Sequence, residues 1–248
     1  MIAPTPGQPQ PTPRPAKPPT TVGGGKAARA ARKQQQRHEL ANTSLRKGLA
    51  PSTFSGAAVW SGGMLALLWA ILIVNAVLDH RLLRFGIKPR QLDGLSGIIF
   101  SPFLHANAGH LVANSVPFAV LAWLLLISGV RYFVLVTAAG VLAAGLVDWL
   151  AGPSGSVIVG ASGVIFCWLG YLLARAWFSR KLAWIAVAVA VALVFSSMFS
   201  GLLPRLGGNV FWGGHVSGFA VGVVVAYAFH RRPARPKPTN GAPPFLTS

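Results

Sequence analysis

One long apolar stretch between two basic, proline-rich tails constrains this chain more than any other feature. Residues 57–230 are mostly apolar, and a helix needs roughly 20 apolar residues to cross a bilayer. Only 10% of the chain is charged, whereas a typical soluble domain has about 25% charged residues. Because lipid offers no partners to unpaired backbone groups, helices are the expected spans. The sequence therefore predicts an all-α polytopic membrane protein.

The length of the apolar stretch predicts six transmembrane helices within a domain of residues 56–230. The two flanking segments, 1–55 and 231–248, are rich in Pro, Lys and Arg and poor in aliphatic runs. Such segments bury too little apolar surface to offset their ordering entropy, so we expect two disordered basic tails. The spans are expected near 57–78, 104–127, 132–151, 160–178, 182–200 and 211–229.

The distribution of positive charge predicts the orientation of these spans. Of the 22 Lys and Arg residues, seventeen fall on the side of the two tails and five on the other side. Lys and Arg are enriched in cytoplasmic segments, so both termini are expected in the cytoplasm. The net charge of +18 suits anionic lipid headgroups, and no nucleic-acid partner is expected. The Ala-, Gly-, Pro- and Arg-rich composition is typical of GC-rich bacterial genomes, which indicates a bacterial plasma membrane.

Acidic and thiol groups are too few for several kinds of site. The four acids are Glu39, Asp79, Asp93 and Asp148, and the single cysteine is Cys167. Their scarcity excludes EF-hands, two-metal sites, paired glycosidase acids, an intrachain disulfide framework and CxxC motifs. We expect no cofactor and no metal. Cys167 lies about 140° around the helix from the serine of the fourth span, so it is interpreted as a packing residue.

Three polar clusters interrupt the apolar stretch. His110 and Asn114 lie near the start of the second span, together with His105. Ser162 lies in the sequence GASG at the start of the fourth span, and His215 lies in GGHVSG at the start of the sixth. With the N-terminus inside, all three spans begin at the outer face, so the clusters share one depth. Because intramembrane polar groups are costly, each is a candidate functional group.

Helical spacing predicts which of these groups meet. His110 and Asn114 are four residues apart and share a face, whereas His105 points elsewhere or precedes the helix. Glycines follow Ser162 and His215 at helical spacing, which favours close contact between the fourth and sixth spans. That contact would bring the Ser162 hydroxyl to the His215 ring.

A serine beside a neutral histidine is an activated nucleophile, because the imidazole takes the hydroxyl proton during attack on a carbonyl. The resulting oxyanion needs hydrogen-bond donors. His110, Asn114 and the backbone N–H of Ser162 could supply them. This set of groups indicates acyl transfer, most simply peptide hydrolysis.

Over residues 57–230 the sequence resembles the rhomboid family of intramembrane serine proteases. The matching motifs are His105-x4-His110-x3-Asn114, the sequence GASG around Ser162, and His215-x2-Gly-x3-Gly. The resemblance implies a Ser–His dyad without an acid, in which Ser162 is the nucleophile and His215 the general base. It also implies that His110 and Asn114 stabilise the oxyanion and that His105 is a structural neighbour. The implied substrates are single-span or other transmembrane proteins in the bilayer.

Two departures from the family pattern concern the first loop and the fourth span. The Trp–Arg pair frequent in the first loop has no evident match, which leaves the structure of that loop open. A tyrosine often found four residues after the nucleophile, where it stacks on the catalytic histidine, is Phe166 here. We expect the stacking to survive and the hydroxyl to be lost.

Several alternatives remain. A catalytically inactive rhomboid-like protein could bind membrane clients without cutting them. A transporter fits poorly, because the polar groups are shallow and uncharged. Asp148 could complete a triad, but a solvated carboxylate at the interface is the expectation. Residues 201–209 are expected to form a flexible outer loop that gates access to the serine.

Overall fold

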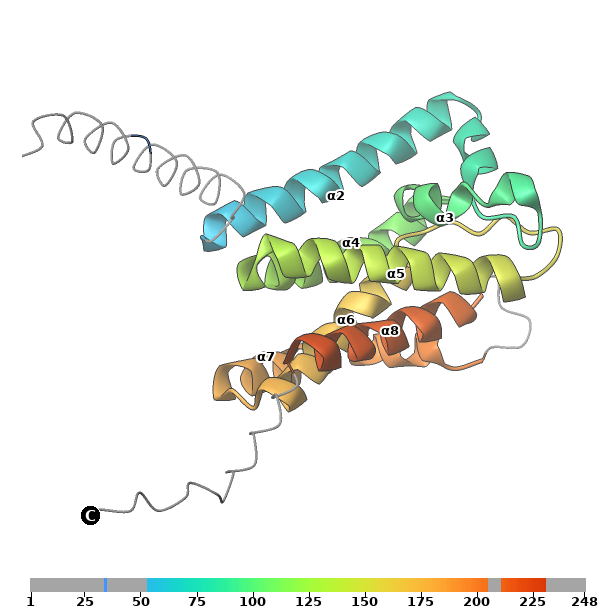
Figure 1. Cartoon of the computed structure of the whole chain (residues 1–248). Helices are drawn as coiled ribbons and strands as arrows, with labels where there is room; N and C mark the ends of the chain where they lie inside the picture. The colour runs from blue at the N-terminus through green and yellow to red at the C-terminus, as the bar shows by residue number, and fades with distance from the viewer. Residues whose placement is uncertain (1–33, 35–52, 205–210, 231–248) are drawn as a thin grey trace, which may run out of the picture. The chain divides into compact units, whose positions relative to one another are not determined.

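The computed structural model describes residues 53–204 and 211–230, together with Gln34. Most of both predicted tails and the segment 205–210 lie outside the described residues. Within these described residues, five helices are long and apolar enough to cross a membrane: α2 (Phe54–Val77), α4 (Ala108–Ser128), α5 (Val130–Ala151), α6 (Ser162–Ser179) and α8 (Gly213–His230). The predicted all-α polytopic fold is confirmed (Figure 1).

The fifth predicted span is not one straight helix. It consists of α7 (Leu182–Val194) and the 3₁₀ helix η4 (Ser196–Leu202), which are bent by 73° relative to each other. If this bent pair is counted as one span, the described residues contain six candidate spans. The prediction of a flexible loop from residue 201 is therefore wrong for the first two of its residues, which belong to η4, and residues 205–209 lie outside the described part.

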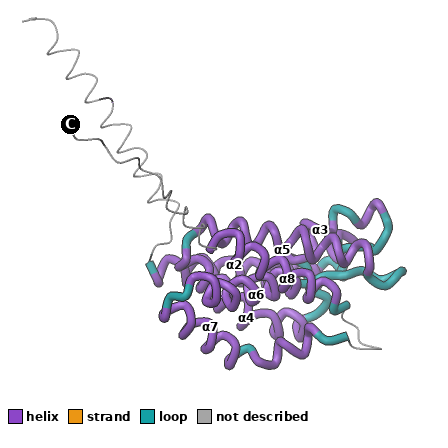
Figure 2. Tube along the Cα trace, turned by 60° about the horizontal axis from the view of Figure 1, so that its bottom comes forward, coloured by secondary structure: helices purple, strands orange, loops and turns teal. Residues whose placement is uncertain are grey.

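Helix α6 lies at the centre of the bundle and is the most buried of the spans. It packs against α4, α5, α7 and α8 (Figures 1 and 2). Trp168, Leu169, Tyr171 and Leu172 on α6 are almost fully enclosed. By contrast, α2 and α5 expose many apolar side chains, as expected for surfaces that face lipid. The central position of α6 holds its first residue, Ser162, in a rigid frame.

Close packing of α6 and α8 depends on glycine. A Cβ at Gly218 would collide with the carbonyl oxygen of Gly163, and a Cβ at Gly222 would collide with that of Cys167. Small residues allow two helix backbones to approach in this way. The predicted contact between the fourth and sixth spans is confirmed. The side chain of Cys167 points toward α5 instead, where its Sγ donates to the Val136 carbonyl at 3.3 Å.

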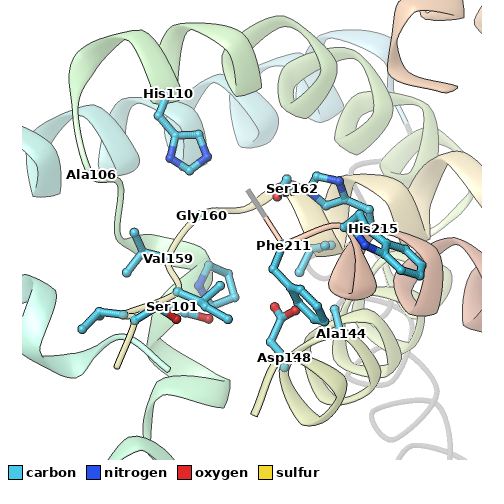
Figure 3. Close-up of a pocket in the computed structure, with 18 of the residues that line it drawn as sticks. Ser101, Ala106, His110, Ala144, Asp148, Val159, Gly160, Ser162, Phe211 and His215 are labelled. Atoms are coloured by element: carbon cyan, nitrogen blue, oxygen red, sulfur yellow. Dashed lines mark hydrogen bonds between the residues drawn. The ribbon is translucent and has the colours of Figure 1, made fainter. Parts of the chain in front are cut away.

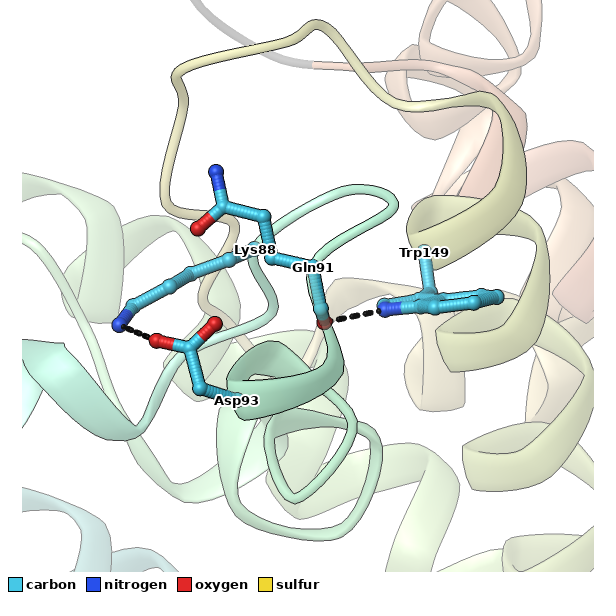
Figure 4. A network of polar contacts seen from close by, with 4 residues as sticks. All are labelled: Lys88, Gln91, Asp93 and Trp149. Atoms are coloured by element: carbon cyan, nitrogen blue, oxygen red, sulfur yellow. Dashed lines mark hydrogen bonds and ion pairs between the residues drawn. The ribbon is translucent and has the colours of Figure 1, made fainter.

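The first loop, residues 78–107, is folded despite the missing Trp–Arg pair. It contains four short helices: η1 (Arg81–Phe85), η2 (Leu92–Gly94), α3 (Gly97–Phe100) and η3 (Ser101–Phe103). The Arg90 guanidinium donates to the carbonyls of Leu150 and Gly152 at 3.0 and 2.8 Å. Trp149 on α5 donates from Nε1 to the Gln91 carbonyl at 2.9 Å (Figure 4). These bonds fix the loop to the end of α5.

An ion pair closes the same loop on itself. Lys88 Nζ lies 2.5 Å from Asp93 Oδ2 (Figure 4). The hydrogen bond from Lys88 holds the pKa of the exposed Asp93 carboxyl below its usual value.

The connection between α5 and α6 rests on the first loop. Ile87 and Ile158 form an antiparallel bridge, and the Gly160 N–H donates to the Ser101 carbonyl at 2.9 Å. These bonds fix the position of the segment before α6 relative to the first loop. The first loop thereby positions Ser162.

Candidate active site

Ser162 and His215 meet where α6 and α8 begin. Ser162 is the first residue of α6, and His215 lies in the first turn of α8. The Ser162 Oγ and the His215 Nε2 are 2.8 Å apart, which is hydrogen-bond distance. His215 is 8% exposed. Figure 3 shows the two side chains facing each other at the cavity.

The other ring nitrogen of His215 is held by the backbone. Its Nδ1 lies 3.0 Å from the carbonyl oxygen of Gly201 in η4. A carbonyl oxygen can only accept, so Nδ1 carries the proton and donates. In the neutral ring Nε2 is then unprotonated, and it accepts the hydrogen bond from the Ser162 hydroxyl.

Phe166 fixes the plane of the His215 ring. The two ring centroids are 4.4 Å apart and the planes are inclined by 23°, a stacked arrangement. Phe166 lies one helical turn after Ser162, so α6 supplies both the hydroxyl and the stacking ring. The expectation that stacking survives the replacement of tyrosine is confirmed.

His110 lies across the cavity from His215 (Figure 3). Asn107 caps α4 and accepts a hydrogen bond from the His110 backbone N–H at 2.9 Å. Gly160 has a φ of +126°, and a Cβ there would lie 2.8 Å from the His110 Nε2. Glycine is therefore needed at this position for conformation and for space. It lets the chain pass beneath the imidazole just before Ser162.

His105 precedes α4, which is one of the two positions expected for it, and from there it bonds to Asn114. The Asn114 Nδ2 lies 3.2 Å from the His105 Nε2. The chain from His105 to Asn107 precedes α4, so the helical angle between positions 105 and 114 does not apply. His105 is 1% exposed. Burial, with a smaller contribution from His110, lowers the pKa of His105 to about 4.

Two cavities meet at the serine. The larger, of about 530 Å³, is lined by Ser162, His215, His110 and Asp148 together with the chain from Ser156 to Gly160. The smaller, of about 270 Å³, is lined by Ser162, His215, His110, Asn114, Phe166 and Gly201. All four predicted site residues, Ser162, His215, His110 and Asn114, therefore surround one space.

Asp148 differs from its expected solvated position. It lines the larger cavity, and its Oδ1 is covered, with no hydrogen-bond partner in the described part of the chain. A Cβ at Gly214 would collide with the carboxylate. The absence of a side chain at Gly214 lets the start of α8 lie against the Asp148 carboxylate. It does not bond to His215, whose Nδ1 is held by Gly201.

Sequence reasoning missed the part played by Gly201. A backbone acceptor has no side-chain signature, and the glycine itself indicated only a loop.

The groups around the cavity can together carry out nucleophilic attack. An unprotonated imidazole nitrogen at 2.8 Å from a hydroxyl can take its proton when the oxygen attacks an electrophile. The cavity admits that electrophile beside His110 and Asn114.

The sequence matches the Rhomboid domain over residues 93–232. An uncharacterized protein of Mycobacterium tuberculosis is 42% identical over 169 residues, which cover 65% of this chain and 70% of that protein. An uncharacterized protein of Mycobacterium leprae is 38% identical over 170 residues, which cover 66% of this chain and 67% of that protein. The matched domain contains all of α4, α5, α6 and α8 and the residues that surround Ser162. This multi-pass membrane protein therefore belongs to the rhomboid family.

Proposed function

We propose that this protein is an intramembrane serine endopeptidase that cuts peptide bonds in or near transmembrane helices. Ser162 is the nucleophile and His215 is the general base. The observation that carries the proposal is the hydrogen bond of 2.8 Å between the Ser162 Oγ and the His215 Nε2. Membership of the rhomboid family, which includes intramembrane proteases, supports it.

The first step is attack of the Ser162 Oγ on the substrate carbonyl carbon, while its proton passes to the His215 Nε2. The imidazolium that forms keeps its Nδ1–H bond to the Gly201 carbonyl at 3.0 Å. That bond does the orienting work that a carboxylate does in a triad. Stacking on Phe166 keeps the ring from turning away from the serine.

The oxyanion formed in this step needs preorganised donors. The Ser162 backbone N–H lies at the start of α6, where the first four N–H groups of a helix have no intrahelical partner. The His110 ring and the Asn114 amide line the smaller cavity beside the Ser162 hydroxyl. One Asn114 N–H bonds to His105, which leaves the second for the oxyanion. Such donors contribute about 3–4 kcal/mol each to transition-state stabilisation.

Three proton transfers complete the reaction, and the last of them returns a proton from the His215 Nε2 to the Ser162 Oγ. The protonated His215 gives its proton to the leaving amine, which departs with one half of the substrate. A water molecule then attacks the acyl-enzyme, loses its proton to the His215 Nε2, and releases the carboxylate product with Ser162 restored. Substrates are single-span or other transmembrane proteins. The excess of Lys and Arg on the side of the two tails supports an orientation with both termini in the cytoplasm of a bacterial cell and the site facing outward.

A fluorophosphonate probe tests this proposal directly. Detergent-solubilised wild type should be labelled, because the activated oxygen displaces fluoride from phosphorus. Ser162→Ala and His215→Ala should not be labelled, whereas Ser115→Ala should be. Ser115 is a matched control because it lies on α4 and bonds to the Leu111 carbonyl and to Trp69. Absent labelling of folded, monodisperse wild type would contradict the proposal and favour a client-binding protein.

A further inference from the structure

The end of α6 farthest from Ser162 carries a buried cation. Arg175 lies about 20 Å along the helix axis from Ser162, at a rise of 1.5 Å per residue, and it is only 9% exposed. Its Cζ lies 3.6 Å from the centroid of the Trp184 ring and 5.5 Å from that of the Tyr132 ring. The Tyr171 hydroxyl accepts a hydrogen bond from the guanidinium. All of these neighbours are neutral.

The charge of Arg175 has no anionic partner in the part of the chain that the structure describes. Its Nε and Nη1 are covered and have no hydrogen-bond partner there. The acids of that part are Asp79 and Asp93 in the first loop and Asp148 near the end of α5, all at the same end of the bundle as Ser162. A buried charge without a partner is costly, and a bound anion would offset that cost.

The N-terminus of α7 lies beside this cation. Trp184, which lies against the Arg175 guanidinium, belongs to the first turn of α7. The N-cap residue is Lys181, and its side chain makes no capping hydrogen bond. The N–H groups of Leu182 and Ala183 therefore have no partner within the helix. Free N–H groups at the N-terminus of a helix are a favoured site for phosphate and other anions.

Two further groups lie at this end of the bundle. The Oγ of Ser179, one helical turn after Arg175 on α6, is covered and has no hydrogen-bond partner among the described residues. Arg175 and Lys181 both lie close to His230 at the end of α8. Basic and hydroxyl groups thus gather around an uncapped helix where α6 ends and α7 begins (Figure 1). This combination suits an anion with several oxygen atoms.

We propose that the connection between α6 and α7 binds a phosphate group. Its oxygens accept hydrogen bonds from the Arg175 guanidinium and from the first N–H groups of α7, and the exposed Lys181 adds a second positive charge. The charge distribution supports a cytoplasmic position for this end of the bundle, where anionic lipid headgroups are abundant. The proposal is independent of the role proposed for Ser162.

The surface of α7 offers a place for the acyl chains of a lipid whose phosphate is bound here. Leu182, Ile185, Val189 and Leu193 are 81%, 42%, 54% and 71% exposed, and their spacing places them on one face of the helix. That face leads from the proposed phosphate site toward the middle of the span. A phosphate in solution would need only the polar groups, so the experiment includes both sources.

Thermal unfolding measures binding, because a ligand that binds the folded protein raises the midpoint. The protein is first exchanged into detergent free of phospholipid. Three ligands are then compared: dioleoylphosphatidylglycerol, dioleoylglycerol, which has the same chains without phosphate, and inorganic phosphate at matched ionic strength. The phospholipid should raise the midpoint by about 5 °C more than dioleoylglycerol. A similar rise with inorganic phosphate would support the same site and show that the acyl chains are not needed.

Two variants and a matched control assign the binding to this site. In Arg175→Gln the gain should fall to within about 1 °C, and in Lys181→Gln, at an exposed position, it should fall by about half. Arg84→Gln is the control, because the Arg84 guanidinium also lies over an aromatic ring, 4.7 Å from the Phe85 centroid, but in the first loop. This variant should keep the full gain.

Two results would overturn the proposal. One is a wild-type midpoint that responds equally to dioleoylphosphatidylglycerol and dioleoylglycerol and does not respond to inorganic phosphate. The other is a gain that persists undiminished in Arg175→Gln. If Arg175→Gln does not fold, an undiminished gain in Lys181→Gln overturns the proposal instead.

Discussion

The carbonyl oxygen of Gly201 lies 3.0 Å from the His215 Nδ1 and accepts a hydrogen bond from the N–H at that position. A backbone group of η4 thus sets the tautomer of a histidine on α8. Since α7 and η4 are bent by 73° relative to each other, the bend is what brings this carbonyl over the ring. The orientation of His215 therefore depends on the shape of the fifth span.

Enlarging Gly201 should lower activity. A Cβ there would lie 2.9 Å from the Phe166 Cζ and 3.4 Å from the His215 Nδ1, so Gly201→Val should displace the carbonyl or the ring. We expect kcat/KM to fall about 10- to 100-fold, since small misplacements of catalytic groups have effects of this size. Gly63→Ala on α2 is the control, because nothing lies within 4 Å of its added Cβ. Equal rates for Gly201→Val and wild type would contradict this role of η4.

Replacing the stacked ring should separate activity from stability. Phe166→Leu removes the flat surface that lies 4.4 Å from His215 and keeps an apolar side chain. We expect the rate of fluorophosphonate labelling to fall about tenfold, with a loss of stability of about 1 kcal/mol. Phe178→Leu, on the same helix but stacked edge-on against Tyr227, should lose similar stability and keep its labelling rate. Parallel losses of labelling in both variants would assign Phe166 to packing alone.

The glycines of α8 should be intolerant of a methyl group. A Cβ at Gly222 would meet the carbonyl oxygen of Cys167, and backbone cannot yield as a flexible side chain does. Gly222→Ala should force α6 and α8 apart and lower the free energy of unfolding by about 1–3 kcal/mol. It should also lengthen the distance between the Ser162 Oγ and the His215 Nε2. Thermal unfolding in detergent and probe labelling measure the two effects. Gly62→Ala on α2, where nothing lies within 4 Å, should change neither.

Much of this arrangement could be predicted from the sequence because it depends on local patterns. Apolar runs of about 20 residues predicted the spans, and glycines at helical spacing predicted the contact of α6 with α8. The pairing of Ser162 with His215 followed from that contact. The patterns behind these predictions can each be read within the sequence of a single span.

The features that sequence reasoning missed depend on groups distant in the chain or without side chains. The Gly201 carbonyl is a backbone acceptor, and the bend before it arises where α7 ends. The Oδ1 of Asp148 is covered because Gly214 of a separate helix, α8, lies against the carboxylate, a packing relation that α5 alone does not encode. The bond of His105 to Asn114 arises because the chain turns before α4, where helical periodicity does not apply.

The buried His105 should make stability depend on pH. Its pKa is about 4 in the folded protein, against about 6.5 for an unperturbed histidine. Between these values the unfolded chain binds a proton that the folded protein does not bind. The free energy of unfolding should therefore fall as the pH is lowered from about 6.5 to about 4, by up to about 3 kcal/mol.

Denaturation in detergent at several pH values measures this dependence. His105→Gln retains an amide group that can bond to Asn114 but does not titrate. In this variant the unfolding free energy should therefore fall less between about pH 6.5 and about pH 4, because the contribution of His105 is absent. Wild type and His105→Gln should differ in slope throughout that window and run parallel above about pH 7. If both lose stability at the same rate as the pH falls, His105 is not kept neutral by its burial, and its bond to Asn114 does not depend on the neutral ring.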